Sequence, residues 1–88
     1  MASTDTDKSY DHFLDAKGLN CPLPVLRAKL ALNRMKPGEI LCVEATDPHA
    51  TIDFKAYCAR AKHVIISTET KDDILTFYIK RNALAHGD

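Results

Sequence analysis

The stretch whose residues could most readily carry out a reaction is Cys21-Pro22-Leu23-Pro24, a cysteine followed by two prolines one residue apart. A cysteine thiolate is a nucleophile, and its reactivity depends on its exposure and its pKa. Gly18, just before it, can adopt the positive φ that a tight turn requires. Proline is favoured in the first turn of a helix, where its missing N–H would be unpaired anyway. The spacing therefore predicts Cys21 at or next to a helix N-cap, with Pro22 as the first helical residue.

This position has consequences for the thiol. A helix N-terminus favours the negative thiolate, which lowers the pKa of a cysteine placed there. The Leu23 amide can point at the sulfur, but Pro24 has no amide to donate, so we expect only modest activation. Lys17, Arg27 and Lys29 lie near Cys21 in sequence and could help to hold an anionic sulfur, although a solvated surface position is favoured for Lys29. The alternative is that Cys21 is a small buried hydrophobic residue; the turn before it and the Pro-x-Pro pattern after it favour exposure.

The whole chain has the size and composition of one small domain. Its 88 residues carry 12 basic and 12 acidic side chains, so no strong field attracts nucleic acid, and we expect no strong direct binding to it. No segment is long and apolar enough to span a membrane, and the polar N-terminus lacks a signal-peptide core, which favours the cytoplasm. We expect residues 1–9 to be a disordered lead-in, residues 10–81 the folded domain and residues 82–88 a loose tail.

The cysteines and histidines give no metal site. Cys21, Cys42 and Cys58 form no C-x-x-C pair, so neither a zinc ribbon nor a thioredoxin-like dithiol is indicated. The histidines at positions 12, 49, 63 and 86 also lack metal-ligand spacing. In a reducing compartment the three thiols should be free, and the simplest division is one reactive cysteine and two structural ones.

Hydrophobic periodicity predicts strands over residues 10–15, 40–45, 64–70 and 74–80 and helices over residues 22–35 and 50–62. The order β-α-β-α-β-β favours a two-layer α/β sandwich, in which both helices cover one face of a mixed four-stranded sheet. Alternation along the second strand places Cys42 on the partly open face away from the helices. Cys58 falls in the buried stripe of the second helix.

The first helix carries a second apolar stripe that begins beside Cys21. Leu23, Leu26 and Leu30 lie opposite the expected core face, flanked by Arg27. They are either scattered surface residues, which are common, or a docking patch for a partner that must reach the sulfur. Asp47 precedes the second helix and can cap it, while Asp53 complements the positive end of that helix.

The sequence Asp15-Ala-x-Gly18-Leu19-x-Cys21-Pro22-x-Pro24 resembles the signature of the TusA/SirA-like sulfur carrier proteins. Further matches in the same order are Pro37-Gly38-Glu39, Asp47-Pro48, Asp53 and His63. The resemblance covers about residues 12–81 and implies the sandwich described above. One departure is Leu23, because some members of the family carry an acidic residue between the two prolines.

The resemblance also implies an activity. Cys21 would accept sulfane sulfur as a persulfide from a cysteine desulfurase and pass it to a cysteine of a downstream relay protein. In the best-known branch the relay ends in 2-thiolation of the wobble uridine of certain tRNAs, while other branches serve sulfur oxidation or molybdenum-cofactor enzymes. Such a protein is a carrier with sulfurtransferase activity rather than a stand-alone turnover enzyme, and it needs no cofactor besides the transient persulfide.

On this basis we assign residues to three roles. Cys21 is the reacting residue. The residues expected to shape and support its loop are Asp15, Gly18, Leu19, Pro22 and Pro24. Those expected to dock partners are Leu23, Leu26, Arg27, Leu30 and Asp47.

Two other functions stay open. A thiol redox or peroxide-reducing enzyme could use Cys21, although the lack of a C-x-x-C partner weighs against it. A noncatalytic regulatory binding module is also compatible, because small sandwiches host unrelated functions.

Overall fold

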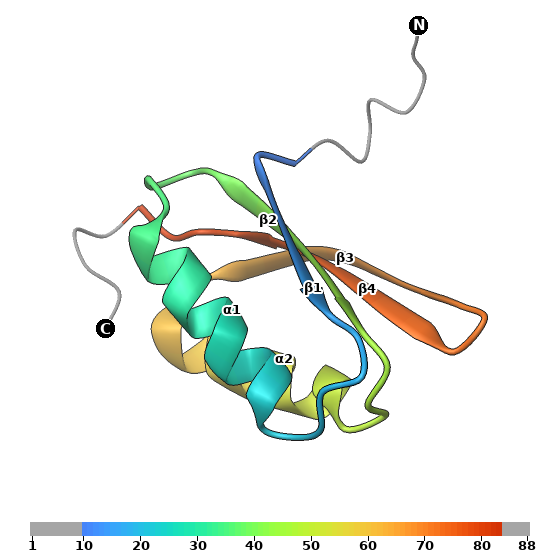
Figure 1. Ribbon diagram of the computed structural model, residues 1–88. Coiled ribbons are helices and arrows are strands. Elements are labelled where there is room, and N and C mark those ends of the chain that lie inside the picture. The colour runs from blue at the N-terminus through green and yellow to red at the C-terminus, as the bar shows by residue number, and fades with distance from the viewer. Residues whose placement is uncertain (1–9, 84–88) are drawn as a thin grey trace, which may run out of the picture.

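The computed structural model describes residues 10–83. The elements along the chain are β1 (His12–Ala16), α1 (Leu23–Arg34), β2 (Ile40–Ala45), α2 (Ala50–Ala61), β3 (Val64–Lys71) and β4 (Ile74–Lys80). Figure 1 shows them as two layers, with both helices on one face of the sheet. The predicted two-layer α/β sandwich is therefore confirmed. The expected N-terminal lead-in, residues 1–9, lies outside the described residues.

The strand order is β1-β2-β4-β3. β1 pairs with β2 in parallel, whereas β4 is antiparallel to both of its neighbours, so the sheet is mixed as predicted. Parallel pairing makes β1 and β2 end at the same edge of the sheet, with Ala16 opposite Ala45. The loops that lead into α1 and α2 therefore leave from one end of the molecule, and this end holds Cys21.

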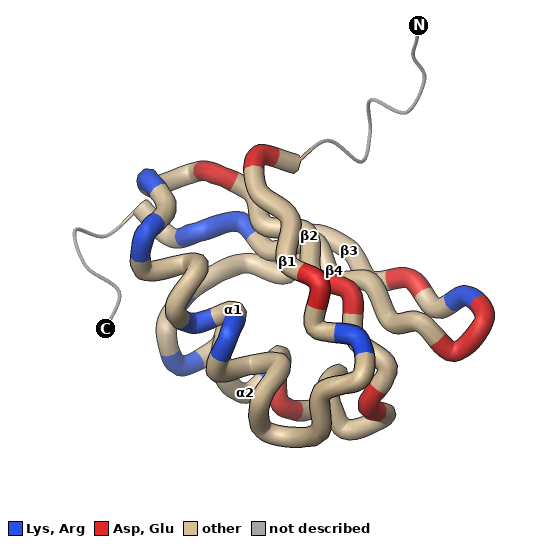
Figure 2. Tube along the Cα trace, in the orientation of Figure 1, with Lys and Arg blue, Asp and Glu red and all other residues tan. Residues whose placement is uncertain are grey.

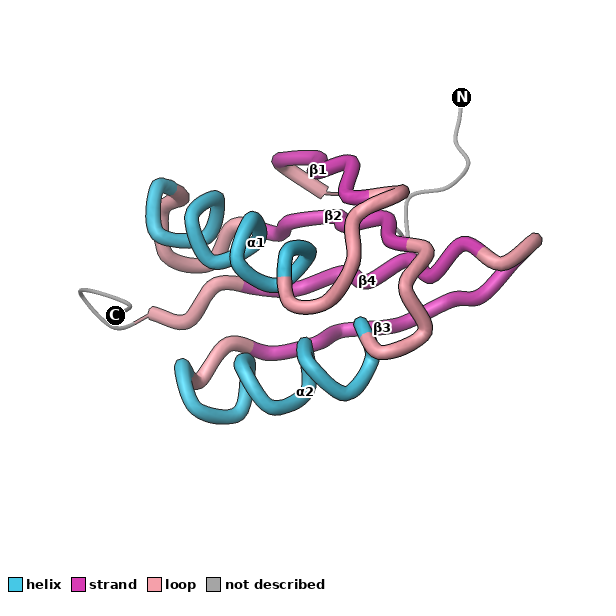
Figure 3. The backbone as a smooth tube through the Cα atoms, turned by 60° about the horizontal axis from the view of Figure 1, so that its bottom comes forward, coloured by secondary structure: helices cyan, strands magenta, loops and turns pink. Residues whose placement is uncertain are grey.

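The core lies between the sheet and the helices. Figure 3 shows α1 lying along the β1–β2 side of the sheet and α2 along β3. The helix faces that meet the sheet are apolar: Ala28 and Leu32 of α1 and Phe54 and Cys58 of α2 are buried, as expected for Cys58. The rings of Phe54 and Phe77 join the layers, with their centroids 4.7 Å apart.

The sheet face away from the helices is partly covered by aromatic side chains, which corrects the expectation for Cys42. The register places Cys42 between Phe13 of β1 and Tyr78 of β4. The ring of Tyr10 lies 6.2 Å from that of Phe13 and 6.3 Å from that of Tyr78. Cys42 is consequently buried, with 3% of its surface exposed, although the second strand does place it on the face that we predicted.

The C-terminal boundary also differs from the prediction. We expected a loose tail from residue 82, but Asn82 is buried, like Arg81 before it. The Asn82 side-chain amide donates a hydrogen bond to the Ala61 carbonyl at 2.5 Å, and its backbone N–H donates to His63 Nδ1 at 3.0 Å. Asn82 therefore belongs to the folded domain, while residues 84–88 lie outside the described part of the chain.

Candidate functional site

Cys21 is exposed in the loop between β1 and α1. The helix begins one residue later than predicted: Pro22 is the N-cap, Leu23 the first helical residue and Pro24 the second. Cys21 therefore lies next to the N-cap, and the Cys21–Pro22 peptide bond is cis. The Leu23 N–H donates to the Asn20 carbonyl at 2.8 Å, so the prediction that it points at the sulfur is wrong.

Two carboxylates reach Cys21 from the neighbouring loop and helix. The thiol donates a hydrogen bond to Asp53 Oδ2, with 2.7 Å between sulfur and oxygen. The Cys21 backbone N–H donates to Asp47 Oδ2. Asp47 precedes α2 and Asp53 lies in its first turn, so both contacts cross from the α1 loop to the start of α2.

These contacts reverse the expected effect on the thiol. The hydrogen bond to Asp53 is the largest cause that raises the pKa of Cys21, followed by partial desolvation and the negative charges of Asp53 and Asp47. A carboxylate that accepts the thiol proton stabilises the thiol and repels the thiolate. The expectation that the helix N-terminus would lower the pKa of Cys21 is therefore wrong, because it left out the two carboxylates.

Asp47 does not have the capping role that we expected. The N-cap of α2 is His49, which makes no side-chain capping bond. The other carboxylate oxygen of Asp47 accepts a hydrogen bond from the His49 backbone N–H at 2.9 Å. Bonds to His49 and Cys21 hold the pKa of Asp47 below its usual value. Asp47 thus joins the Cys21 loop to the turn before α2 rather than capping the helix.

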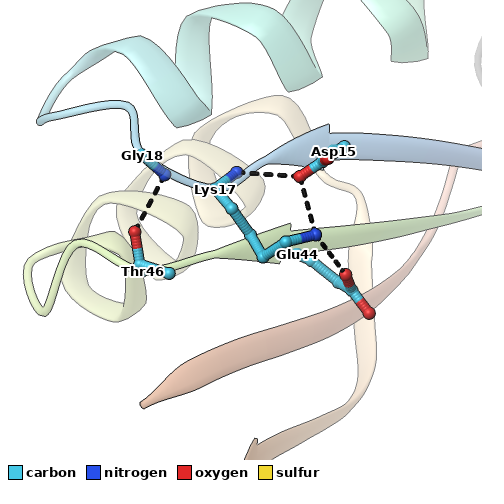
Figure 4. A network of polar contacts seen from close by, with 5 residues as sticks. All are labelled: Asp15, Lys17, Gly18, Glu44 and Thr46. Carbon is cyan, nitrogen blue, oxygen red and sulfur yellow. Dashed lines mark hydrogen bonds and ion pairs between the residues drawn. The ribbon is translucent and has the colours of Figure 1, made fainter. Parts of the chain in front are cut away.

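The loop before Cys21 is shaped by the predicted motif residues (Figure 4). Gly18 has φ of 85°, in the region that favours glycine, and its N–H donates to Thr46 Oγ1 at 2.9 Å. The Leu19 N–H donates to the Ala16 carbonyl at 3.2 Å and closes the turn, and the Leu19 side chain packs against the core. These bonds fix the path of the chain from β1 towards Cys21.

Lys17 is engaged away from the sulfur. Its Nζ lies 2.9 Å from Asp15 Oδ1 and 2.8 Å from Glu44 Oε1, as Figure 4 shows. The ion pair lowers the pKa of Asp15. The structure thus supports Asp15 as a residue that shapes the loop, and it does not support the expectation that Lys17 holds an anionic sulfur.

The second apolar stripe of α1 is exposed as predicted. Leu23, Leu26 and Leu30 expose 43%, 48% and 58% of their surfaces. Arg27 is also exposed, whereas Pro24 is buried against the core side of the helix. The docking role of these residues stays a prediction.

The other two cysteines are buried. Burial raises the pKa of Cys58 to about 11, and it is also the main cause that raises the pKa of Cys42. Residues 10–83 contain no cluster of three His, Cys, Asp or Glu side chains that could hold a metal ion. No helix in the described part of the chain is long and apolar enough to cross a membrane.

The contact between Asp53 and the Cys21 thiol was not predicted from the sequence. We had assigned it only to the positive end of α2. The available signal was topological: β1 and β2 are parallel neighbours, so the loops that follow them must meet. A carboxylate in the first turn of α2 then lies near a cysteine that precedes α1.

A domain that exposes one thiol and buries the others is suited to carry a group on that thiol rather than to cycle an internal disulfide. Comparisons with known proteins give the family. The family model described as "Sulfurtransferase TusA" matches residues 12–81. The chain belongs to this family of sulfur carriers.

Individual relatives agree. The sulfur carrier protein TusA of Allochromatium vinosum is 42% identical over 73 residues, which cover 83% of this chain and 96% of that protein. A putative sulfur carrier protein of Neisseria meningitidis is 45% identical over 67 residues, covering 76% of this chain and 90% of that protein. The SirA-like protein of Desulfitobacterium hafniense superposes with a TM-score of 0.72 at 23% identity, covering 82% of this chain and 99% of the other, and so supports the fold.

Proposed function

We propose that this protein relays sulfane sulfur as a persulfide on Cys21, from a cysteine desulfurase to a cysteine of a downstream relay protein. The observation that carries this proposal is the contrast in exposure: Cys21 is exposed, whereas Cys42 and Cys58 are buried. A carrier thiol must reach the active cysteine of one partner and then that of another, and only an exposed sulfur can do so.

The transfer needs no oxidant. The Cys21 thiolate attacks the terminal sulfur of the donor's cysteine persulfide and forms a new S–S bond. The S–S bond of the donor breaks, and its cysteine leaves as a thiolate that takes up a proton. The second transfer repeats the step with Cys21 as the leaving group, so the sulfane sulfur changes partner without net oxidation or reduction.

Burial of the other two thiols keeps them from attacking a persulfide on Cys21. A nearby free thiolate would attack the persulfide, form a disulfide with Cys21 and release the sulfur as sulfide. Cys42 and Cys58 are buried, and their raised pKa values keep both as thiols. The charged persulfide on Cys21 therefore meets no internal competitor, which suits a carrier better than a peroxide-reducing enzyme.

The partner surface in this proposal runs from the sulfur along α1. It consists of Leu23, Leu26, Arg27 and Leu30 of α1, together with Asp47, which lies beside the Cys21 loop in the turn before α2. Three half-exposed leucines on one helix face offer apolar area to a protein partner. Such a surface suits a relay in which sulfur passes between proteins. In such a relay the carrier itself does not need to bind tRNA.

We further propose that the relay operates in the cytoplasm and ends in 2-thiolation of the tRNA wobble uridine, on the basis of the resemblance to the best-known branch of the family. Sulfur oxidation and molybdenum-cofactor maturation are the alternative ends. Expression of this protein in a bacterium lacking its own carrier should restore wobble 2-thiouridine, measured by mass spectrometry of tRNA nucleosides. Loading of Cys21 without such restoration would point to another branch.

The decisive experiment is intact-protein mass spectrometry after incubation with a cysteine desulfurase and cysteine. We expect a gain of one sulfur atom that is lost on reduction and maps to the Cys21 peptide. Cys21→Ser should not load, whereas the control Cys42→Ala should load if circular dichroism shows that it folds. Loading of Cys21→Ser, or a wild-type protein that stays unloaded even with polysulfide, would contradict the proposal. Catalytic peroxide consumption with a sulfenic acid at Cys21 would support a redox enzyme instead.

A further inference from the structure

The Cys21 sulfur lies in a negatively charged environment, which is unexpected for a thiol that must act as a nucleophile. Its thiol proton is directed at Asp53 Oδ2, 2.7 Å from the sulfur, and the Cys21 backbone N–H bonds to Asp47. Figure 2 shows acidic segments, with a basic segment beside them, around the end of the sheet from which the Cys21 loop leaves. Both carboxylates come from the loop and helix that follow β2.

The basic residues near this end do not compensate the charge at the sulfur. Lys17, in the Cys21 loop, is paired with Asp15 and Glu44. His49 Nδ1 lies 3.3 Å from Asp47 Oδ1, whereas Cys21 bonds to the other carboxylate oxygen, Asp47 Oδ2. Arg27 and Lys29 of α1 are exposed, and the charges that act on the Cys21 thiol are those of Asp53 and Asp47. Within residues 10–83, no basic side chain forms a hydrogen bond with the sulfur.

We propose that Asp53 is a positioning residue that holds the unloaded Cys21 as a thiol, and that the Asp47–Asp53 pair selects sulfur donors presenting a positive charge beside the reacting sulfur. This deepens the proposed function, on which its biological meaning rests. A cationic group that approaches Asp53 competes for the carboxylate and weakens its hold on the thiol proton. The exposed thiol then releases its proton to water, and the thiolate forms where such a donor is bound. The free carrier stays a thiol and reacts more slowly with oxidants and other disulfides.

The first test measures alkylation of Cys21 by iodoacetamide as a function of pH. Iodoacetamide is neutral, so its rate reports the thiolate: the sulfur forms a bond to carbon and iodide leaves with the electron pair. Asp53→Asn and Asp53→Ala should both move the rise in rate to lower pH and speed alkylation several-fold near neutral pH. Asp53→Ala removes the carboxylate without adding a donor, and so separates loss of the charge from a new hydrogen bond.

The matched control is Asp72→Asn, in the turn between β3 and β4. It removes the same charge from the domain, and Asn tolerates the φ of 53° that Asp72 adopts. Peptide mapping restricts the readout to Cys21. Asp72→Asn should keep the wild-type pH profile. An unchanged profile in both Asp53 variants, or slower alkylation in them, would overturn the proposal; slower alkylation would mean that Asp53 serves as a base.

The second test compares a cationic and an anionic disulfide, cystamine and dithiodiglycolate, as reaction partners of Cys21. The thiolate attacks one sulfur, a mixed disulfide forms and the other half leaves as a thiolate. The wild type and Asp72→Asn should react several-fold faster with the cationic disulfide, and added salt should reduce the difference. Asp53→Ala and Asp47→Asn should each lower the ratio of the two rates. A ratio that is the same in all four proteins would overturn the charge-selection part.

Neither test uses a desulfurase, so the inference and the proposed function can fail separately. If Cys21 shows this selectivity but never gains sulfur from a desulfurase or polysulfide, the inference stands and the carrier proposal fails. If Cys21 gains sulfur but its alkylation has the same pH profile in the wild type and the Asp53 variants, the carrier proposal stands and the proposed role of Asp53 is wrong.

Discussion

Arg81 Nε donates a hydrogen bond to the Leu32 carbonyl at 2.7 Å and ties the end of β4 to the last turn of α1. The backbone of Arg81 also bridges the turn after α1: its N–H donates to the Glu39 carbonyl at 2.9 Å, and its carbonyl accepts from the Gly38 N–H at 3.1 Å. Asn82 makes the equivalent connection to α2 through the Ala61 carbonyl. Two consecutive residues therefore close the C-terminal ends of both helices.

The first prediction concerns this connection. Arg81→Met keeps an unbranched side chain that reaches about as far as Nε but removes the guanidinium and its donors, including the one that bonds to the Leu32 carbonyl. The free energy of unfolding should fall by about 1–3 kcal/mol, the usual cost of removing a buried partner. Urea denaturation measures it. Lys80→Met, at the exposed neighbouring position, is the control and should change stability by less than about 0.5 kcal/mol; equal losses in the two variants would contradict the role of Arg81.

The second prediction concerns the pH dependence of stability through His63. Burial, and then the nearby charge of Arg81, lower the pKa of His63 from 6.5. The unfolded chain therefore binds a proton at higher pH than the folded one. Stability from His63 is complete above the unfolded pKa and is lost as the pH falls from there through the folded pKa. The free energy of unfolding should thus decrease between about pH 7 and pH 5, before ordinary carboxylates titrate.

A variant isolates this contribution. In His63→Asn the side-chain oxygen can replace Nδ1 as the acceptor for the Asn82 N–H without titrating. Urea unfolding of this variant should depend less on pH in the same interval. Above about pH 7, where His63 is neutral in both the folded and the unfolded chain, the two proteins should show the same dependence on pH, which serves as the control. If the slope is unchanged in His63→Asn, another group is responsible.

The third prediction tests the leucine stripe of α1. Leu26→Ser should leave the fold and polysulfide loading of Cys21 intact, but should slow loading by the desulfurase several-fold because a protein donor loses apolar contact. Ile66→Ser is a matched control, since Leu26 exposes 48% and Ile66 49% of its surface. Initial loading rates by mass spectrometry give the comparison. Equal effects of the two substitutions would show that Leu26 is an ordinary surface residue.

The fourth prediction separates the shape of the Cys21 loop from general stability. Gly18 and Gly38 have φ of 85° and 87°, and neither has an atom within 4 Å of an added Cβ. Alanine at either position should therefore cost about 1–2 kcal/mol through the backbone conformation alone. Gly18→Ala should also slow desulfurase loading of Cys21, whereas Gly38→Ala should not. Equal loading rates in the two variants would remove Gly18 from the site.

Much of the fold could be predicted because its signals are local. The alternation of Leu41, Val43 and Ala45 defines the inward face of β2, and the helical spacing of Phe54 and Cys58 defines that of α2. The bounds of β2 and β4 match the predicted ones, while β1 begins two residues later and ends one residue later than expected. The Gly18 turn and the prolines likewise placed Cys21 beside the start of a helix.

What could not be predicted depends on contacts between distant parts of the chain. The pKa of Cys21 is raised because Asp53, 32 residues later, accepts a hydrogen bond from the thiol, whereas local reasoning considered the helix N-terminus and the basic residues near in sequence. Cys42 is buried because Phe13 and Tyr78 flank it in the sheet. Asn82 resembled a tail residue because its partners, Ala61 and His63, lie about twenty positions earlier.

The reacting thiol and the contacts that stabilise the fold lie at opposite ends of α1. At one end the Cys21 loop meets Asp47 and Asp53; at the other, about 18 Å away along the twelve-residue helix, Arg81 bonds to the Leu32 carbonyl. Substitutions that change thermal tolerance can therefore accumulate around Arg81 while the sulfur end keeps its charges. The same separation gives protein engineers a place to stabilise, label or fuse the domain at a distance from its reacting thiol.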